Sequence, residues 1–202
     1  TGLPNRLLLA DRLSQACMVA DREQTRVAVC LFDLDAFKPV NDRFGHAMGD
    51  RLLGECARRV EGLLRGMDTV ARLGGDEFVV ILTGVTLRDQ AEQVIERIQA
   101  GVSAPYQIDG ETLVVSASLG YTLYPDDRAD ADTLLRHADK AMYAAKDSGR
   151  ATWQRYDVDS RDETNALLAA LEGALARHEL VLHYQPQVDL RTGRVLGHEA
   201  LL

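Results

Sequence analysis

Two acidic residues at the start of a strongly apolar segment point to cation chemistry. Residues 72–82 are RLGGDEFVVIL, so Asp76 and Glu77 follow two glycines and precede five apolar residues. A carboxylate beside a buried segment is costly unless it is paired or holds a metal. Gly74 and Gly75 lack side chains, which lets a large anion approach the backbone closely. An ordinary turn with solvated acids is the alternative interpretation.

A second apolar segment ends in acidic residues, which could bind a cation together with Asp76 and Glu77. Residues 26–35 are RVAVCLFDLD, an apolar run that ends in Asp33 and Asp35, as is typical of a strand buried on both faces. Ligands bind open α/β sheets outside the carboxyl ends of strands. Carboxylates there suit Mg²⁺, which prefers oxygen ligands and leaves positions for phosphates. Two such ions about 3.5–4 Å apart can clamp both oxygens of a phosphoryl transfer.

Composition limits the class of function. The 202 residues are 46% hydrophobic, enough for a packed core, and the net charge of -8 excludes general nucleic-acid binding. Cys17, Cys30 and Cys56 are odd in number and widely spaced, which predicts buried free thiols in a reducing compartment. No apolar run approaches the roughly 20 residues of a membrane span. We therefore expect a cytoplasmic segment without membrane contact, in a parent protein that other segments could anchor to a membrane.

The segments around the acids alternate between helical and extended patterns. Helices are expected at 5–22, 47–65, 87–100 and 131–147, and strands at 26–35, 70–73, 78–82, 106–108, 112–119 and 152–156. Gly74-Gly75 is a turn signal for a β-hairpin. Farther on, Ser160-x-x-Glu163 is a capping box that opens a helix to about residue 177. Two further strands are expected at 180–185 and 195–201.

With its motifs in place, the chain resembles the GGDEF domain family, the diguanylate cyclases. The resemblance rests on TGLPNR (1–6), FDLDAFKPVND (32–42), FGHAMGD (44–50), RLGGDEF (72–78), SASLGYTLYPDD (116–127) and ADKAMYAAKDSGR (138–150). Residues 182–202 resemble the opening of an EAL domain, the family that hydrolyses cyclic di-GMP. The expected organisation is a GGDEF domain at 1–157, then a linker helix and a truncated N-terminal EAL segment at 158–202, cut from a tandem GGDEF–EAL protein.

The resemblance implies a fold and an activity. The fold is α/β (α+β), with a mostly antiparallel sheet of about five strands surrounded by helices, like the palm of nucleotide cyclases and polymerases. The activity is the condensation of two GTP molecules into cyclic di-GMP and two pyrophosphates. Each subunit of a homodimer presents one GTP, and each 3′-hydroxyl attacks the α-phosphate held by the other subunit. Mg²⁺ or Mn²⁺ is the implied cofactor.

The matched motifs also imply roles for single residues. Asp33, Asp76 and the carbonyl of Leu34 correspond to metal ligands, and Glu77 to an acid that assists deprotonation of the 3′-hydroxyl or contacts the metal. The residues that match substrate contacts are Asn41 and Asp50 for guanine, the backbone at Phe37 and Lys38, and the side chains of Lys146 and Arg150 for phosphates.

These roles agree with the chemistry of the side chains. An Asp accepts from the donor edge of guanine, and Asn both donates and accepts. Arg forks onto phosphate oxygens, and Lys offers a compact charge. Lys146 and Arg150 are four residues apart, so one helical turn would aim both the same way. The alternative is that they complement the dipole at a helix C-terminus.

Arg65-Gly-Met-Asp68 lies where the family carries its inhibitory RxxD site. The resemblance implies that cyclic di-GMP binds there and stops the two half-sites from meeting, with Arg72 as a secondary contact. The alternative is that Arg65 only caps a helix at Gly66.

A regulatory function is the rival hypothesis. Glu199 of Glu-Ala-Leu matches a metal ligand of EAL domains, whose remaining ligands would lie beyond residue 202, so this chain alone is not expected to be a phosphodiesterase. In the rival, the domain is a non-catalytic module that binds GTP or cyclic di-GMP and controls a downstream EAL phosphodiesterase. The intact acids Asp33, Asp76 and Glu77 speak against it.

Overall fold

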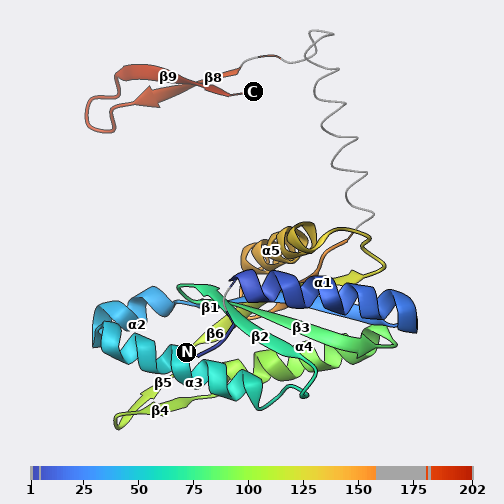
Figure 1. The fold of residues 1–202 in the computed structure, drawn as a ribbon. Coiled ribbons are helices and arrows are strands. Elements are labelled where there is room, and N and C mark those ends of the chain that lie inside the picture. The colour runs from blue at the N-terminus through green and yellow to red at the C-terminus, as the bar shows by residue number, and fades with distance from the viewer. Residues whose placement is uncertain (1, 5, 158–180, 182, 202) are drawn as a thin grey trace. The chain divides into compact units, whose positions relative to one another are not determined.

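The protein divides into two units, Thr1–Tyr156 and Asp157–Leu202. The structure, a computed structural model, describes residues 2–4, 6–157, 181 and 183–201. The first unit is an α/β domain with one main sheet and helices on both of its faces (Figure 1). Among the helices described, none combines the length and apolar character that a membrane crossing needs.

A five-stranded sheet forms the centre of the first unit, in the order β2-β3-β1-β6-β7. Its strands are β1 (Arg26–Asp35), β2 (Thr69–Gly74), β3 (Glu77–Val85), β6 (Ser116–Tyr124) and β7 (Trp153–Arg155). The central strand β1 pairs antiparallel with β3 and β6, and β2 pairs antiparallel with β3. The edge strand β7 alone runs parallel to its neighbour, β6. The expected mostly antiparallel sheet of about five strands is thereby confirmed.

The two faces of β1 enter different halves of the core. Successive side chains of a strand point to opposite faces, so Cys30, Phe32 and Leu34 join one cluster while Val29 and Leu31 join the other. Helices α2 (Phe37–Phe44), α3 (His46–Glu61) and α4 (Arg88–Ser103) cover the first face, and α1 (Arg6–Glu23) and α5 (Ala131–Asp147) cover the second (Figure 1). Burial on both faces explains the unbroken apolar run of β1.

Several element boundaries differ from the expectation, two of them by four residues or more. Helix α3 ends at Glu61 rather than at residue 65, because Gly62 forms its C-cap. The expected strand 112–119 is wrong: residues 111–113 form β5 (Glu111–Leu113), which pairs only with β4 (Tyr106–Ile108), while β6 is separate and continues to Tyr124. Pairing along nearly the whole of β1 carries β6 past Gly120, where the local sequence weakens the strand pattern.

The cysteines are free thiols, and two of the three are buried as expected. Cys30 and Cys56 are buried, whereas Cys17 on α1 is only half-buried, so the expectation of burial is wrong for Cys17. Burial raises the pKa of the Cys56 thiol to about 11, which keeps it protonated and unreactive at neutral pH.

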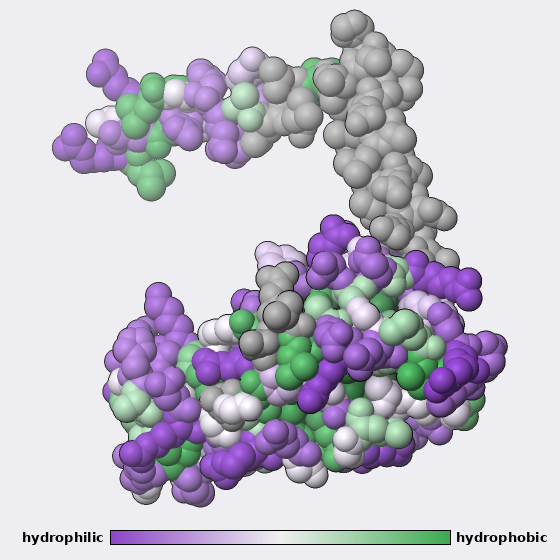
Figure 2. Space-filling model, in the orientation of Figure 1, coloured by the Kyte–Doolittle hydropathy of each residue, from purple (hydrophilic) through white to green (hydrophobic). Residues whose placement is uncertain are grey.

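The described part of the second unit is a hairpin of β8 (His183–Val188) and β9 (Val195–Leu201). Its apolar side chains are exposed; Tyr184 and Leu196 keep 64% and 73% of their surface in contact with solvent, and Figure 2 shows apolar residues gathered on this hairpin. The strand expected at 180–185 begins at His183 in the structure. The helix expected from Ser160 lies outside the described residues.

Gly120 marks the closest approach of the sheet to a helix. A Cβ there would lie 1.9 Å from the Met142 backbone nitrogen and 2.3 Å from the Ala138 carbonyl oxygen of α5. We expect Gly120→Ala to lower the free energy of unfolding in urea by about 3 kcal/mol or more, because backbone atoms cannot yield. Gly54→Ala is the control, since a Cβ at that helical position meets nothing within 4 Å. It should stabilise by about 0.5–1 kcal/mol, and equal effects of the two substitutions would contradict the packing argument.

Candidate functional site

The acids of the two motifs meet at one edge of the sheet. In the antiparallel register of β1 and β3, Asp33 pairs with Glu77. The backbone N–H of Leu34 donates to the Asp76 carbonyl oxygen at 3.4 Å. Behind them the rings of Phe32 and Phe78 stack at 5.0 Å, which anchors the ends of both strands in the core. Residues more than forty positions apart are therefore neighbours, as the strand pattern predicts.

A glycine makes the turn that carries Asp76. Strand β2 ends at Gly74 and β3 begins at Glu77, so Gly75 and Asp76 form the turn itself. Gly75 has φ +54°, a conformation that glycine adopts without steric cost. The Arg72 Nε donates to the Gly75 carbonyl oxygen at 2.8 Å, which braces the turn from β2. Arg72 thus supports the acidic turn, and its expected part in an inhibitory site stays a prediction.

The acids repel one another. Burial is the main cause that raises the pKa of Asp33, and the charges of Asp76 and Asp35 raise it further. Burial also raises the pKa of Glu77, with contributions from Asp33 and Asp139. Clustered carboxylates in a partly dry setting favour a bound cation.

Lys146 supplies one cation from the chain itself. Its Nζ lies 2.9 Å from Asp33 Oδ1, and the two side chains are 25% and 15% exposed. This ion pair lowers the pKa of Asp33 against the effect of burial. Lys146 also lies in the last turn of α5, so it complements the helix dipole as well. The expected phosphate ligand therefore contacts an expected metal ligand.

Arg150 does not share the helical turn of Lys146. Helix α5 ends at Asp147, and Arg150 follows in a turn with φ +62°. The prediction that one helical turn aims both cations is wrong, because Ser148 caps the helix first. The Arg150 side chain is exposed, and the backbone of the turn sets where it lies.

The expected guanine contacts come together through a second glycine. A Cβ on Gly49 would lie 2.0 Å from Asn41 Oδ1 and 3.1 Å from Phe37 Cζ. The Asn41 side chain therefore packs against the backbone of α3 directly before Asp50, which is exposed. Sequence analysis did not single out Gly49, although its place beside Asp50 in FGHAMGD is a signal for such contact.

Helix α2 begins next to the acids. Ala36, with φ +60°, precedes it and gives no side-chain cap to its N-terminus. Phe37 is buried and Lys38 is exposed. The first N–H groups of a helix have no intrahelical acceptor and favour anions. Pro39 removes one such donor at the third position, where proline is tolerated, and leaves those of Phe37 and Lys38.

The donor atoms at this edge fit a hard divalent cation. Asp33 and Asp76 offer carboxylates and Leu34 a backbone carbonyl, which are oxygen ligands of the kind that Mg²⁺ prefers. Within the described residues, no three or more His, Cys, Asp or Glu side chains gather as a complete metal site. Protein atoms would thus hold only part of a coordination shell, which leaves positions for phosphate and water.

The expected inhibitory pair lies elsewhere. Asp68 accepts from the Arg65 backbone N–H at 3.0 Å and from the Thr83 N–H at 3.2 Å, so it holds the loop against β3. Because α3 ends at Glu61, the alternative in which Arg65 caps a helix at Gly66 is wrong. Thr83 is six residues from Glu77 along β3, about 20 Å at 3.3 Å per residue.

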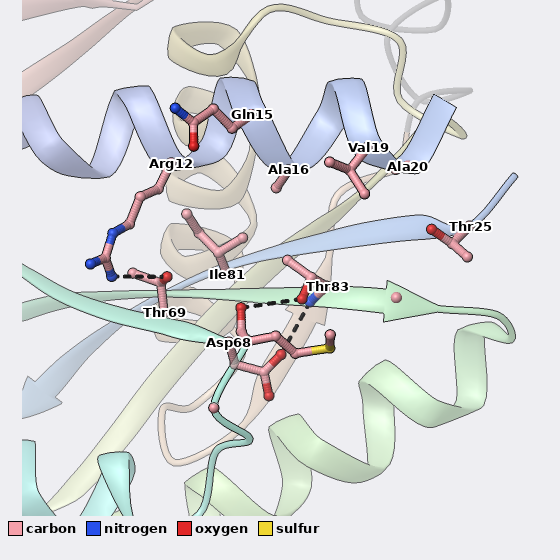
Figure 3. A pocket seen from close by; sticks show the side chains of 13 residues that line it. Arg12, Gln15, Ala16, Val19, Ala20, Thr25, Asp68, Thr69, Ile81 and Thr83 are labelled. Atoms are coloured by element: carbon pink, nitrogen blue, oxygen red, sulfur yellow. Dashed lines mark hydrogen bonds between the residues drawn. The ribbon is translucent and has the colours of Figure 1, made fainter. Parts of the chain in front are cut away.

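A hollow of about 400 Å³ adjoins Asp68, between α1 and the ends of β2 and β3 (Figure 3). Arg12 reaches across its rim from α1 and donates to Thr69 Oγ1 at 3.3 Å. Gln15 and Val19 follow on the same helix, and Ile81 forms part of the floor (Figure 3). The hollow is therefore separate from the acidic edge.

Two further acidic residues complete the survey. Glu199 lies on β9, where sequence analysis expected a strand, and it is paired with Gln185 and exposed in the second unit. Asp35 lies with Asp33 at the C-terminal end of β1, as expected, and it is buried, with 6% exposure, which sequence analysis did not foresee. The alternation of Ser116 and Ser118 on the neighbouring strand was the signal for its hydrogen bonds.

The fold and the acidic strand ends define an α/β domain, and comparison with known proteins defines its family. Residues 1–152 match the family model described as diguanylate cyclase, GGDEF domain. The chain therefore belongs to the GGDEF domain family.

Two curated relatives illustrate this membership. The bifunctional diguanylate cyclase/cyclic di-GMP phosphodiesterase MucR of Pseudomonas aeruginosa is 46% identical over 205 residues, which cover 100% of this chain and 30% of MucR. Diguanylate cyclase TpbB of the same organism is 42% identical over 153 residues, 75% of this chain and 35% of TpbB. The chain thus spans about a third of the length of these curated relatives.

Solved structures agree with the fold. The GGDEF domain of TpbB matches with a TM-score of 0.75 and 40% identity, over 78% of this chain and 98% of that one. The GGDEF domain of DgcB from Caulobacter crescentus, solved in complex with c-di-GMP, matches with a TM-score of 0.69 and 27% identity, over 77% and 92%.

The ion pair at the acidic edge can be tested on its own. We expect Lys146→Met to raise the pKa of Asp33, because the substitution removes the hydrogen bond and the charge that lower it. The measurement is an NMR titration of the carboxyl carbons. Lys140→Met, at an exposed position of the same helix, is the control and should leave the Asp33 titration unchanged. An unaltered titration in Lys146→Met would show that the two side chains do not interact.

Proposed function

We propose that residues 1–157 form a diguanylate cyclase that condenses two GTP molecules into cyclic di-GMP and two pyrophosphates. The observation that carries the proposal is the convergence of Asp33, the Asp76-Glu77 turn and Lys146 at one edge of the sheet. Membership of the GGDEF family and the name of the relative TpbB support it.

The acidic edge would hold the metal and the phosphates. Asp33, Asp76 and the Leu34 carbonyl are the proposed ligands of Mg²⁺ or Mn²⁺. When bound, the cation neutralises phosphate charge and activates the α-phosphate toward attack. Lys146 then exchanges its contact with Asp33 for phosphate oxygens, and the N–H groups at the start of α2 receive the terminal phosphates.

Glu77 is the proposed proton acceptor. Burial raises the pKa of Glu77 toward neutral pH. This direction suits a general base, which must take up a proton near physiological pH. It lies opposite Asp33 in the sheet, so a 3′-hydroxyl directed at the α-phosphate would come within its reach.

Guanine recognition falls to the α2–α3 pair. Asn41 can donate to the carbonyl of guanine, and Asp50 can accept from its N1–H and amino group. The contact of Asn41 with the Gly49 backbone supports their joint action on one base.

Catalysis requires a second copy of the domain. One GTP per subunit supplies one 3′-hydroxyl and one α-phosphate, so the cyclic product forms only when two half-sites face each other. The proposed active species is therefore a homodimer, and the rate depends on protein concentration.

A regulatory role is the second candidate. The β8–β9 hairpin lies within the EAL-like segment 182–202, and MucR, which aligns with the whole chain, is named as bifunctional. In that case the first unit binds GTP or cyclic di-GMP without turnover and controls an adjoining phosphodiesterase.

Product formation tests the cyclase proposal. The chain is incubated with GTP and Mg²⁺ at increasing protein concentration, and products are identified by mass. We expect cyclic di-GMP to rise more steeply than linearly with protein, and Asp76→Ala or Asp33→Ala to abolish it with an unchanged circular dichroism spectrum. Glu96→Ala, exposed on α4, is the control. Bound GTP without product at any concentration, even in a coiled-coil fusion that enforces dimers, would favour the regulatory module.

We also propose that the cyclase is inhibited by its product, which binds at Arg65 and Asp68. The DgcB domain was solved with c-di-GMP, and Asp68 already positions the backbone of Arg65. We expect cyclic di-GMP formation to plateau early in the unmodified chain and to continue in Arg65→Ala. Arg22→Ala, with its exposed side chain on α1, should keep the plateau. A plateau that Arg65→Ala leaves in place would exclude the site.

A further inference from the structure

Asp35 is a buried carboxylate without a role in the proposed chemistry. It is the last residue of β1 and is 6% exposed. Its Oδ1 accepts from Ser118 Oγ at 2.8 Å, and its Oδ2 accepts from Ser116 Oγ at 2.7 Å. No ion pair to Asp35 occurs among the residues that the structure describes. Burying a carboxylate is costly unless it is paired or hydrogen-bonded. The structural role of its hydrogen bonds therefore needs an explanation.

The third donor to Asp35 comes from a distant segment. The backbone N–H of Ala151 donates to Asp35 Oδ2 at 3.2 Å, from the turn that follows α5. The two serines lie on β6, which already pairs with β1 through the sheet. Among the hydrogen bonds of the described residues, the Ala151 bond is therefore the one that ties this carboxylate to a separate loop.

That loop has an unfavourable backbone conformation. Arg150 and Ala151 have φ of +62° and +50°, in the left-handed region that non-glycine residues seldom adopt. Two consecutive residues of this kind persist only when surrounding contacts impose them. The Arg150 N–H donates to the Ala145 carbonyl oxygen at 3.1 Å, and the Ala151 N–H donates to Asp35. A charged acceptor is suited to this task, because charge-assisted bonds are the stronger ones.

Asp35 also borders the other phosphate-binding element. Ala36 follows it with φ +60°, and α2 starts at Phe37. One carboxylate thus lies between the start of α2 and the turn that presents Arg150. Lys146, four residues before Arg150, already reaches the same strand end through Asp33.

We propose that Asp35 is a positioning residue for the triphosphate end of the nucleotide. It holds the left-handed turn of Arg150 against the start of α2, so that both elements grip the same phosphates. The inference rests on the proposed function, in that the nucleotide is GTP, and it assigns to Asp35 no contact with GTP or metal.

The test compares a nucleotide that lacks the terminal phosphates with one that carries them. Binding of GMP and of a GTP analogue with an α,β-methylene bridge, which cannot be turned over, is measured by calorimetry with Mg²⁺. We expect Asp35→Ala to weaken the analogue about tenfold and GMP less than twofold, since a charged hydrogen bond is lost behind the Arg150 turn. A purely structural role would weaken both ligands alike.

Two further variants separate positioning from general damage. Ser118→Ala removes the contact to Oδ1 and leaves the bond from Ala151 to Oδ2, so the ratio of the two affinities should stay at the wild-type value. Glycine tolerates φ near +50°, so adding Ala151→Gly to Asp35→Ala should recover at least threefold in affinity for the analogue. If Asp35→Ala does not fold, Asp35→Asn keeps the volume and should weaken the analogue about threefold.

The failures can be told apart. A wild-type chain that binds neither nucleotide overturns the proposed function and this inference with it. A wild-type chain that prefers the analogue, combined with an Asp35 variant that keeps the same preference, overturns the inference alone. Equal losses for both nucleotides, or the same loss in Ser118→Ala, also overturn it.

Discussion

The register of β1 between β3 and β6 is the constraint on which the site depends. Asp33 pairs with Glu77 on one side and with Ser118 on the other. A slip of one residue would move every side chain of a strand to the opposite face, placing Asp33 among the apolar residues near Phe32. Both faces of β1 are packed, so such a slip would bury charges and expose apolar groups on each face at once. The packing on both faces of β1 therefore fixes the positions of the acidic side chains.

Close backbone approaches set the remaining geometry. Gly120 lets α5 pack directly on β6. This packing sets the position from which Lys146 on α5 reaches Asp33. Gly49 does the same for α2 and α3 and thereby sets Asn41 beside Asp50. In each case a glycine without a Cβ allows close packing, and this packing positions a site residue elsewhere in the chain. Side chains of the site come from two strands, three helices and the turns between elements, so small changes in packing would alter their mutual distances.

Much of the fold could be predicted from the sequence, because hydrophobic periodicity and turn residues are local signals. The apolar run of β1 and the glycines before Asp76 indicated a buried strand and a turn, and the sheet has both. One failed expectation depended on long-range pairing: β6 extends past Gly120 because β1 offers partners along its length. The burial of Asp35 and the turn at Arg150 also eluded local patterns, because each depends on a residue more than a hundred positions away. Metal, dimer and nucleotide roles rest on resemblance rather than on local physics.

The acidic edge also affects the stability of this domain. Burial and mutual repulsion raise the pKa values of Asp33 and Glu77 in the folded chain. The folded state then binds protons more readily than the unfolded one, so these groups destabilise the fold as pH rises from their ordinary values, about 4, through the raised ones. Lys146 offsets part of that penalty through its ion pair with Asp33. A cation bound among these carboxylates would stabilise the fold further, because it would bind the folded state alone. The acidic edge therefore has an electrostatic cost in the folded chain, and the proposed cation would relieve it.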